Sequence, residues 1–158
     1  EKAVIAEALS YSGQKGLSGA DIIFTSLEQP PLYEPGVPKE VVSQLFLLGN
    51  LFIFPSTSEN CSLVLLEAML SKNLLILNDD VPQMREFAKE NALYFGFGSI
   101  NTNRSYSDRE HFMEDIAKII VSEFNPNRAL KASNDLKQHF NFDFVFRNQI
   151  EPLFYEHD

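Results

Sequence analysis

The sequence has little cysteine, few basic residues and no long apolar run, and each shortage argues against a class of protein. The one cysteine, Cys61, cannot form a disulfide within the chain, which favours a reducing compartment over secretion. Lys and Arg number 13 against 22 Asp and Glu, and a net charge of -9 argues against nucleic acid as a partner. No apolar run approaches the roughly 18 residues that span a bilayer, and no signal peptide is recognisable. We therefore expect a cytoplasmic protein.

What the chain does have is the composition of a globular domain. Its 158 residues can bury one core, and 44% hydrophobic with 22% charged residues argues against disorder. The first residue is Glu1 rather than Met. We therefore expect a piece of a longer protein, in which 1–158 form a single, truncated domain.

Helical and strand patterns alternate along the chain. Helices are predicted at 1–12, 39–48, 61–72, 83–90 and 108–124, and in the remainder after 127 with a break near Asn141. Strands are predicted at 22–25, 51–54, 74–77 and 92–95. These strands are apolar on both faces, as in a parallel sheet that helices cover on both sides. The fold class is therefore α/β, a three-layer Rossmann-like domain with a parallel sheet of about four strands.

The carboxyl ends of parallel strands are where such sheets bind ligands. The loops at those ends are 26–38, 55–61, 78–82 and 96–107. The second is the most informative, because it joins an apolar strand to an apolar helix through a short polar turn.

Glu67 lies in that helix among apolar neighbours, a pattern that predicts burial and a need for a partner. It is roughly 7–8 Å from the helix N-terminus, where free amides and the helix dipole favour phosphate. A phosphate at Ser62 and Leu63, with Glu67 accepting a diol, would suit a nucleotide's diphosphate and ribose, and Glu59 would reach the far side of the phosphate. Two simpler interpretations stay open. Glu59 could only complement the helix dipole, and Glu67 could point at solvent.

The same residues resemble the C-terminal half of retaining glycosyltransferases of the GT-B fold, the group 1 glycosyl transferases that use sugar nucleotides. The motif consists of Pro55-Ser56, Glu59, seven intervening residues, Glu67-Ala68-Met69, the strand 74–77 and Glu86. The helical segment from Val37 to Asn50 before the motif strand, the segment Asn91–Phe95 and the aromatic stretch Phe142–Tyr155 also resemble the family. The resemblance covers roughly 15–155.

This resemblance implies a role for each site residue. Glu59 would contact the donor sugar as the catalytic residue, and Glu67 would accept the ribose hydroxyls. The other donor-binding residues would lie at the helix start, where backbone amides hold the diphosphate: Asn60, Cys61, Ser62 and Leu63. Such enzymes need no metal or other cofactor. Their partners are a nucleotide sugar, their own N-terminal domain and a glycan or lipid acceptor.

The chain also departs from the family. Asn60, Cys61 and Ser62 stand where the family often has Gly-Phe-Gly, and Cys61 is interpreted as a packing residue rather than a reactive thiol. The usual glycine after the motif helix is missing, and Asn73 is the candidate for the left-handed residue there. The opening strand and helix, with the family's Arg and Lys for the diphosphate, have no match.

The resulting hypothesis is the donor-binding domain of a glycosyltransferase of polysaccharide or glycoconjugate biosynthesis. The missing N-terminal domain would bind the acceptor, so we expect the piece alone to be inactive. Peripheral contact of the whole enzyme with a membrane stays open. The alternatives are a non-catalytic or degenerate Rossmann-like interaction domain and a GT-B-fold sugar-nucleotide epimerase.

Overall fold

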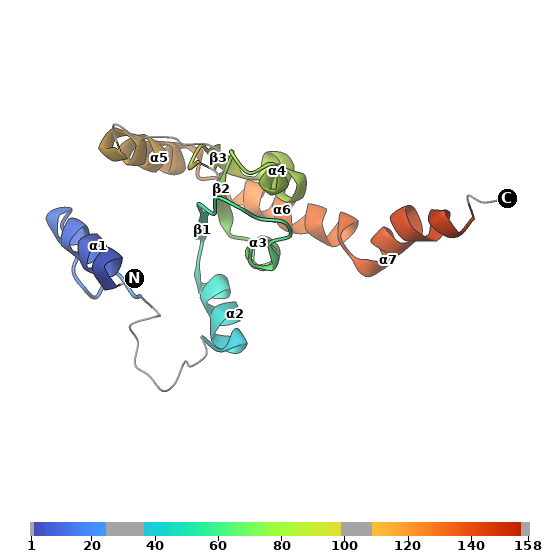
Figure 1. Ribbon diagram of the computed structural model, residues 1–158, viewed down its shortest axis with the longest axis horizontal. Helices are drawn as coiled ribbons and strands as arrows, with labels where there is room; N and C mark the ends of the chain where they lie inside the picture. The colour runs from blue at the N-terminus through green and yellow to red at the C-terminus, as the bar shows by residue number, and fades with distance from the viewer. Residues whose placement is uncertain (1, 25–36, 99–108, 156–158) are drawn as a thin grey trace. The chain divides into compact units, whose positions relative to one another are not determined.

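The computed structural model describes residues 2–24, 37–98 and 109–155. The chain divides into two compact units, residues 1–42 and 43–158 (Figure 1). The first unit begins with helix α1, Lys2–Gln14, which is followed by Gly16 in the left-handed region at a φ of 85°. The helix predicted near the start of the chain is therefore confirmed, and it ends two residues later than expected.

The strand predicted at 22–25 is wrong for the part that the structure describes. Residues 22–24 carry no regular secondary structure, and the side chain of Ile23 is 72% exposed. A short apolar run becomes a strand only where a neighbouring strand accepts its backbone hydrogen bonds, and the sequence pattern does not report that neighbour. Residue 25 lies outside the described residues.

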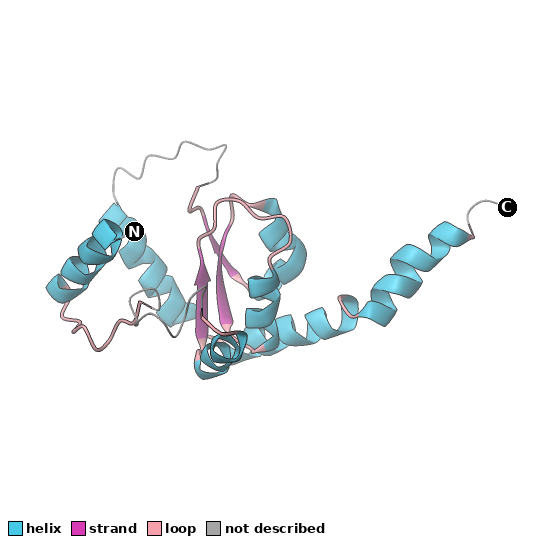
Figure 2. Ribbon diagram, turned by 60° about the horizontal axis from the view of Figure 1, so that its bottom comes forward, coloured by secondary structure: helices cyan, strands magenta, loops and turns pink. Residues whose placement is uncertain are grey.

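The second unit contains a parallel sheet of three strands in the described residues, where about four were expected. The strands are β1 (Leu51–Phe54), β2 (Leu74–Asn78) and β3 (Leu93–Phe95), in the order β1-β2-β3 (Figure 2). Leu51 pairs with Leu74, and Ile76 pairs with Leu93. Every residue of β2 is buried, as expected of a central strand between two helical layers. The predicted α/β class with a parallel sheet is thereby confirmed.

The helices of the described chain fall close to their predicted positions. They are α2 (Lys39–Leu48), α3 (Leu63–Leu70), α4 (Pro82–Ala88), α5 (Arg109–Glu123), α6 (Pro126–His139) and α7 (Phe142–Val145). Short helical turns follow α4 at Lys89–Asn91 and follow α7 at Phe146–Ile150 and Glu151–Phe154. The expected break near Asn141 is confirmed, because its side chain caps α7 by accepting from Phe144 N. None of the described helices combines the length and apolar character needed to cross a membrane.

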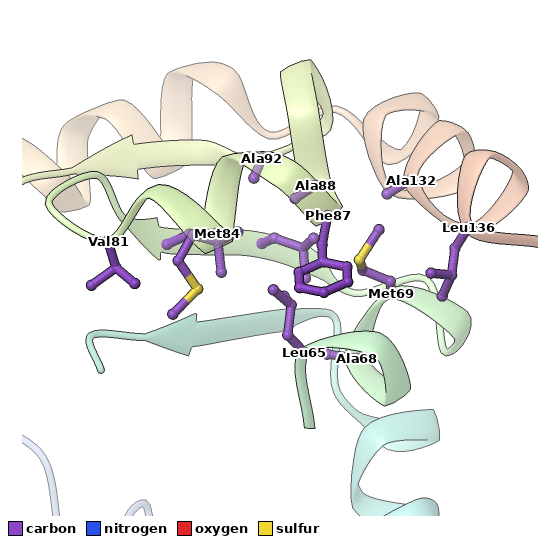
Figure 3. Close-up of a cluster of buried hydrophobic side chains, with 12 residues drawn as sticks. Leu65, Ala68, Met69, Val81, Met84, Phe87, Ala88, Ala92, Ala132 and Leu136 are labelled. Atoms are coloured by element: carbon purple, nitrogen blue, oxygen red, sulfur yellow. The ribbon is translucent and has the colours of Figure 1, made fainter. Parts of the chain in front are cut away.

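One face of the sheet carries the larger hydrophobic core, which is shown in Figure 3. The β2 residues Leu75 and Leu77 pack there against side chains of α3, α4 and α6. The helix residues are Leu65, Ala68, Met69, Met84, Phe87, Ala88, Ala132 and Leu136. This layer fixes α3 against the sheet, and the predicted site lies at the start of α3 and in the loop before it.

The opposite face of the sheet carries a smaller cluster. Leu74, Ile76 and Leu93 are buried there, with Phe97 after β3 and Ile120 of α5 packed against them. The rings of Phe97 and Phe112 meet edge to face with 5.8 Å between their centroids. Helices therefore contribute to both faces, which gives the three layers predicted from strands that are apolar on both sides.

The end of α3 corrects the prediction for Asn73. The left-handed residue is Lys72, with a φ of 63°. Lys72 N donates to Met69 O (3.1 Å), and Asn73 N donates to Ala68 O (3.2 Å). This pair of bonds is the Schellman pattern, which requires the left-handed conformation at the first residue after the cap, here Lys72. Asn73 is instead buried, with its side chain in hydrogen bonds.

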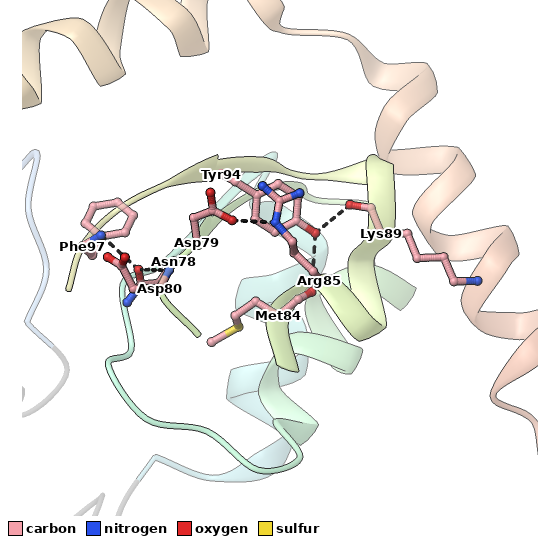
Figure 4. A network of polar contacts seen from close by, with 8 residues as sticks. All are labelled: Asn78, Asp79, Asp80, Met84, Arg85, Lys89, Tyr94 and Phe97. Carbon is pink, nitrogen blue, oxygen red and sulfur yellow. Dashed lines mark hydrogen bonds and ion pairs between the residues drawn. The ribbon is translucent and has the colours of Figure 1, made fainter. Parts of the chain in front are cut away.

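Tyr94 of β3 ties the strand to α4. Its hydroxyl donates to Lys89 O (2.7 Å), and the Arg85 guanidinium lies 4.0 Å from the centre of its ring. Arg85 also forms an ion pair with Asp79 at the end of β2 (Figure 4). Burial raises the pKa of Tyr94 to about 12, and the smaller opposing effect of the Arg85 charge does not cancel this increase.

We expect this shift to make stability depend on alkaline pH. The pKa of Tyr94 is higher in the folded state (about 12) than that of an unfolded tyrosine, about 10. The folded state therefore holds the Tyr94 proton more tightly than the unfolded state does. The stabilisation that results is complete below about pH 10 and is lost as the pH rises toward about 12. Urea unfolding at increasing pH should show the fall. Tyr94→Phe should lose about 1 kcal/mol at neutral pH with its hydrogen bond, and should then show a shallower alkaline fall.

The control for this experiment is Tyr155→Phe, because the Tyr155 side chain is 75% exposed. We expect that variant to keep both the neutral stability and the alkaline fall of the parent chain. Equal alkaline profiles for the parent and Tyr94→Phe would contradict the assignment.

Candidate functional site

Three loops leave the carboxyl edge of the sheet, where parallel sheets bind ligands. Residues 55–62 follow β1, residues 79–81 follow β2, and residues 96–98 follow β3. The first of these loops leads directly into α3, as the sequence predicts. The predicted loop residues at 26–36 and 99–107 lie outside the described residues.

Glu59 lies in the loop after β1 and is half-buried. The Ser56 hydroxyl donates toward Glu59 Oε1 (2.9 Å) and toward the carbonyl O of Ser58 (3.1 Å). This contact holds the Glu59 carboxylate within the loop rather than leaving it to rotate in solvent. Asn60 and Cys61 follow and are both exposed. The interpretation of Cys61 as a packing residue is therefore wrong.

The start of α3 has the form of a capped helix. Ser62 is buried and extended, and its Oγ accepts from Leu65 N at 3.3 Å. The cap satisfies one of the backbone N–H groups that a helix leaves open at its start. The N–H groups of Leu63 and Val64 have no acceptor within the helix, because they precede its first complete turn. The helix start thus presents donors beside the Glu59 loop.

Glu67 lies on the open side of α3. The expectation that this helix is buried all round is wrong, since Leu63 is 69% exposed and Val64 is 43% exposed. Those residues precede Glu67 by four and three positions and so share its face of the helix. Glu67 itself is half-buried. Helical side chains lean toward the helix N-terminus, which directs this carboxylate toward the start of α3.

The charge around this edge is mostly negative. Among residues 43–98 the basic side chains are Lys72, Arg85 and Lys89. Arg85 is paired with Asp79, and Lys89 is paired with Asp135 of α6 at 2.8 Å. Lys72 follows the far end of α3, about 12 Å along the helix from its start. Among the side chains of residues 43–98, an anion at the start of α3 would therefore meet backbone donors rather than a basic group.

Asn78 is the residue that sequence reasoning missed. It ends β2, is fully buried, and hydrogen-bonds to the loop that follows β1. It also bonds to the loop after β3 through Phe97 (Figure 4). Asn78 does not cap the next helix, because Val81 stands at the cap of α4 and makes no side-chain cap bond. One signal in the sequence could have revealed Asn78. It is a polar residue at the carboxyl end of an otherwise apolar buried strand, where burial requires hydrogen-bonding partners.

The structure offers little to a metal ion in the part that it describes. No group of three or more His, Cys, Asp or Glu side chains is placed there to hold one. His139 instead lies against Asp135, with 2.9 Å between Nδ1 and the carboxylate, while His157 lies outside the described residues.

Comparison with known proteins finds no matching family model, no similar curated protein and no similar solved structure.

Proposed function

We propose that residues 43–98 form the donor-binding half-site of a retaining glycosyltransferase, which takes a sugar from a nucleoside diphosphate. The observation that carries this proposal is the arrangement around the start of α3. Open backbone donors stand between a glutamate held in the preceding loop, Glu59, and a glutamate one turn further along the helix, Glu67. Donors suit a diphosphate, and the two carboxylates can each accept from hydroxyl groups on either side of it.

Each group has a separate part in the proposal. The N–H groups of Leu63 and Val64 hold the diphosphate, and the helix dipole stabilises the negative charge that grows on it as the sugar leaves. Glu67 accepts hydrogen bonds from the ribose hydroxyls. Glu59, the proposed catalytic residue, accepts from the sugar and orients it for attack on the face that the leaving group vacates. Positioning and charge stabilisation are the main contributions of this half of the site.

The acceptor and its binding surface belong to another domain in this proposal. We therefore expect no transfer by the chain of 158 residues alone. Because the described loops contribute no basic side chain to the diphosphate, we expect nucleotide binding to be weak, near the millimolar range. A cytoplasmic location and a glycan or lipid acceptor belong to the same proposal.

Titration of the 15N-labelled chain with UDP, GDP and ADP tests the site. We expect backbone amide shifts confined to residues 56–67 and strongest for one of the three bases. Glu67→Gln removes the charge and keeps the shape, and it should weaken binding by about tenfold because a charged acceptor is lost. Glu114→Gln in α5 removes the same charge from an exposed position and should bind as the parent does. Silence from all three nucleotides at millimolar concentration would overturn the proposal.

Glu59 is tested by comparing nucleotide with nucleotide sugar. The probes are UDP with UDP-glucose, GDP with GDP-mannose and ADP with ADP-glucose. Glu59→Gln should weaken the sugar conjugate by several-fold and leave the nucleotide unchanged, because this carboxylate is proposed to contact only the sugar. The Gln side chain can still accept from the Ser56 hydroxyl, so the loop should keep its form. Equal losses for both ligands would contradict the assignment.

The alternative of a non-catalytic interaction domain has one observation in its favour. Leu63 and Val64 are exposed apolar side chains at the start of α3, where a protein partner could cover them. The titration decides between the two functions, since an interaction domain needs no preference among the three bases.

A further inference from the structure

Asn78 uses its complete hydrogen-bonding capacity inside the protein. Nδ2 donates to Ser56 O at 3.0 Å and to Gly98 O, while Oδ1 accepts from Asp80 N and Phe97 N, both at 3.0 Å. A side-chain amide has two donors and two principal acceptor positions, and all four are occupied here. The residue is fully buried, so no water competes for these bonds.

These bonds join the three loops at the carboxyl edge of the sheet. Ser56 follows β1, and Phe97 and Gly98 follow β3. Asp80 follows β2, and Figure 4 shows it with Phe97 around Asn78. The loop after β3 is held a second time, because Gly98 N donates to Asp80 Oδ2 at 2.7 Å. Residues about twenty positions apart in the sequence are thus fixed around one amide group.

The bond to Ser56 leads onward to the proposed catalytic carboxylate. Asn78 Nδ2 holds the carbonyl of Ser56, and the hydroxyl of the same serine donates to Glu59 Oε1. Two consecutive hydrogen bonds therefore connect a fully buried group on the central strand to Glu59. The geometry points to Asn78 as a positioning residue that sets the place of the Glu59 carboxylate through Ser56. Only the identity of the ligand that Glu59 contacts rests on the proposed function, and the positioning of Glu59 by Asn78 does not depend on it.

A merely structural role makes a different prediction. If Asn78 only held the strands together, its loss would lower stability without a particular effect on residues 56–59. If it positions Glu59, its loss changes that loop even when the protein is folded, and it changes how the site treats a sugar. Two variants separate these roles. Each changes a different buried asparagine whose side-chain amide donates to backbone carbonyls.

Asn78→Asp is the first variant. It keeps Oδ1 as an acceptor for Asp80 N and Phe97 N, but it places an oxygen against the carbonyls of Ser56 and Gly98. Asn73→Ala is the matched control. Asn73 is also buried and donates to Phe46 O at 2.9 Å, at the opposite end of β2 from Asn78. Both variants should melt at lower temperatures than the parent, and both are measured below their melting temperatures.

The first readout needs no ligand. Asn78→Asp should shift the backbone amides of residues 56–59 and the side-chain carboxyl carbon of Glu59, and Asn73→Ala should leave these signals unchanged. The second readout is the affinity ratio between a nucleotide sugar and its nucleotide, with the same three pairs of probes. Asn78→Asp should reduce that ratio by several-fold, and Asn73→Ala should keep it.

Ser56→Ala keeps the test decisive if Asn78→Asp does not fold. It breaks the second bond of the connection and leaves the buried amide intact, so it should reproduce both changes at Glu59. Unchanged signals at 56–59 in Asn78→Asp, or equal changes in Asn73→Ala, would overturn the positioning role. If the parent chain binds none of the probes, the proposed function fails, and the ligand-free readout still decides whether Asn78 positions Glu59.

Discussion

Replacing Leu65 by alanine should lower the free energy of unfolding by about 3 kcal/mol. The Leu65 side chain is fully buried in the cluster that also contains Met69 and Phe87 (Figure 3). Removing three carbons from such a site costs their transfer from water and leaves a cavity that the neighbours fill only in part. In urea denaturation the midpoint concentration should fall, while the slope of the unfolding free energy against urea concentration should stay the same. This combination marks a change in stability alone.

Leu63→Ala is the matched control for this prediction. It makes the same chemical change two positions earlier in α3, where the leucine side chain is 69% exposed. We expect a change within about 0.5 kcal/mol. Equal losses in the two variants would mean that α3 presents a different face to the sheet.

The comparison also bears on the candidate site. Leu65 and Glu67 are two residues apart, which places them roughly 200° apart around the helix. If Leu65 faces the core, Glu67 faces away from it and stays open to a ligand. The same experiment that measures the core therefore tests the orientation on which the proposed role of Glu67 depends.

Much of the fold could be predicted from local patterns. The strand at 51–54 and the helix at 39–48 have the bounds that the sequence predicts. Both are marked clearly, the strand by an apolar run closed by Pro55 and the helix by the stop at Gly49-Asn50. Such signals lie within a few residues of the element they limit, so a single sequence carries them.

What the sequence did not predict depends on contacts with distant residues. The run at 22–25 resembles β1 in composition, but residues 22–24 form no strand in the described chain. The apolar residues of α3 predict burial all round, and only the packing of α4 and α6 decides that Leu65 is covered and Leu63 is not. Composition gives the hydrophobicity of a helix without saying which side has a neighbour.

The candidate site divides in the same way. The start of α3, with Glu59 before it and Glu67 within it, follows from a strand, a polar turn and a capped helix that are adjacent in sequence. The hydrogen bonds of Asn78 join residues 56, 80 and 98, and no local pattern brings those together. The sequence therefore suggests which residues could touch a ligand but not which residue holds them in place.

Asn73→Ala should cost about 2 kcal/mol of stability, the second largest effect that we expect. Asn73 Nδ2 donates to Phe46 O at 2.9 Å and to Ala68 O at 3.5 Å. The carbonyl of Phe46 lies in the last turn of α2, where a helix has no backbone N–H of its own to donate to it. Asn73 therefore caps α2 from 27 residues away, and its loss leaves a partly buried carbonyl unsatisfied. Asn134→Ala, an exposed asparagine of α6, should change stability by less than about 0.5 kcal/mol.

Gly49 supplies a second test of the same contact. A Cβ at this position would lie 3.0 Å from Asn73 Oδ1 and 3.3 Å from Leu45 O, so Gly49→Ala should be destabilising by about 1 kcal/mol or more. Asn73→Ala removes the nearer of these two atoms and makes room for the methyl group. The double variant should therefore lose less stability than the two single variants together, by at least about 0.5 kcal/mol in a double-mutant cycle of urea unfolding. Additive losses would show that Asn73 does not lie against the end of α2, and the capping of that helix by a distant side chain would then be wrong.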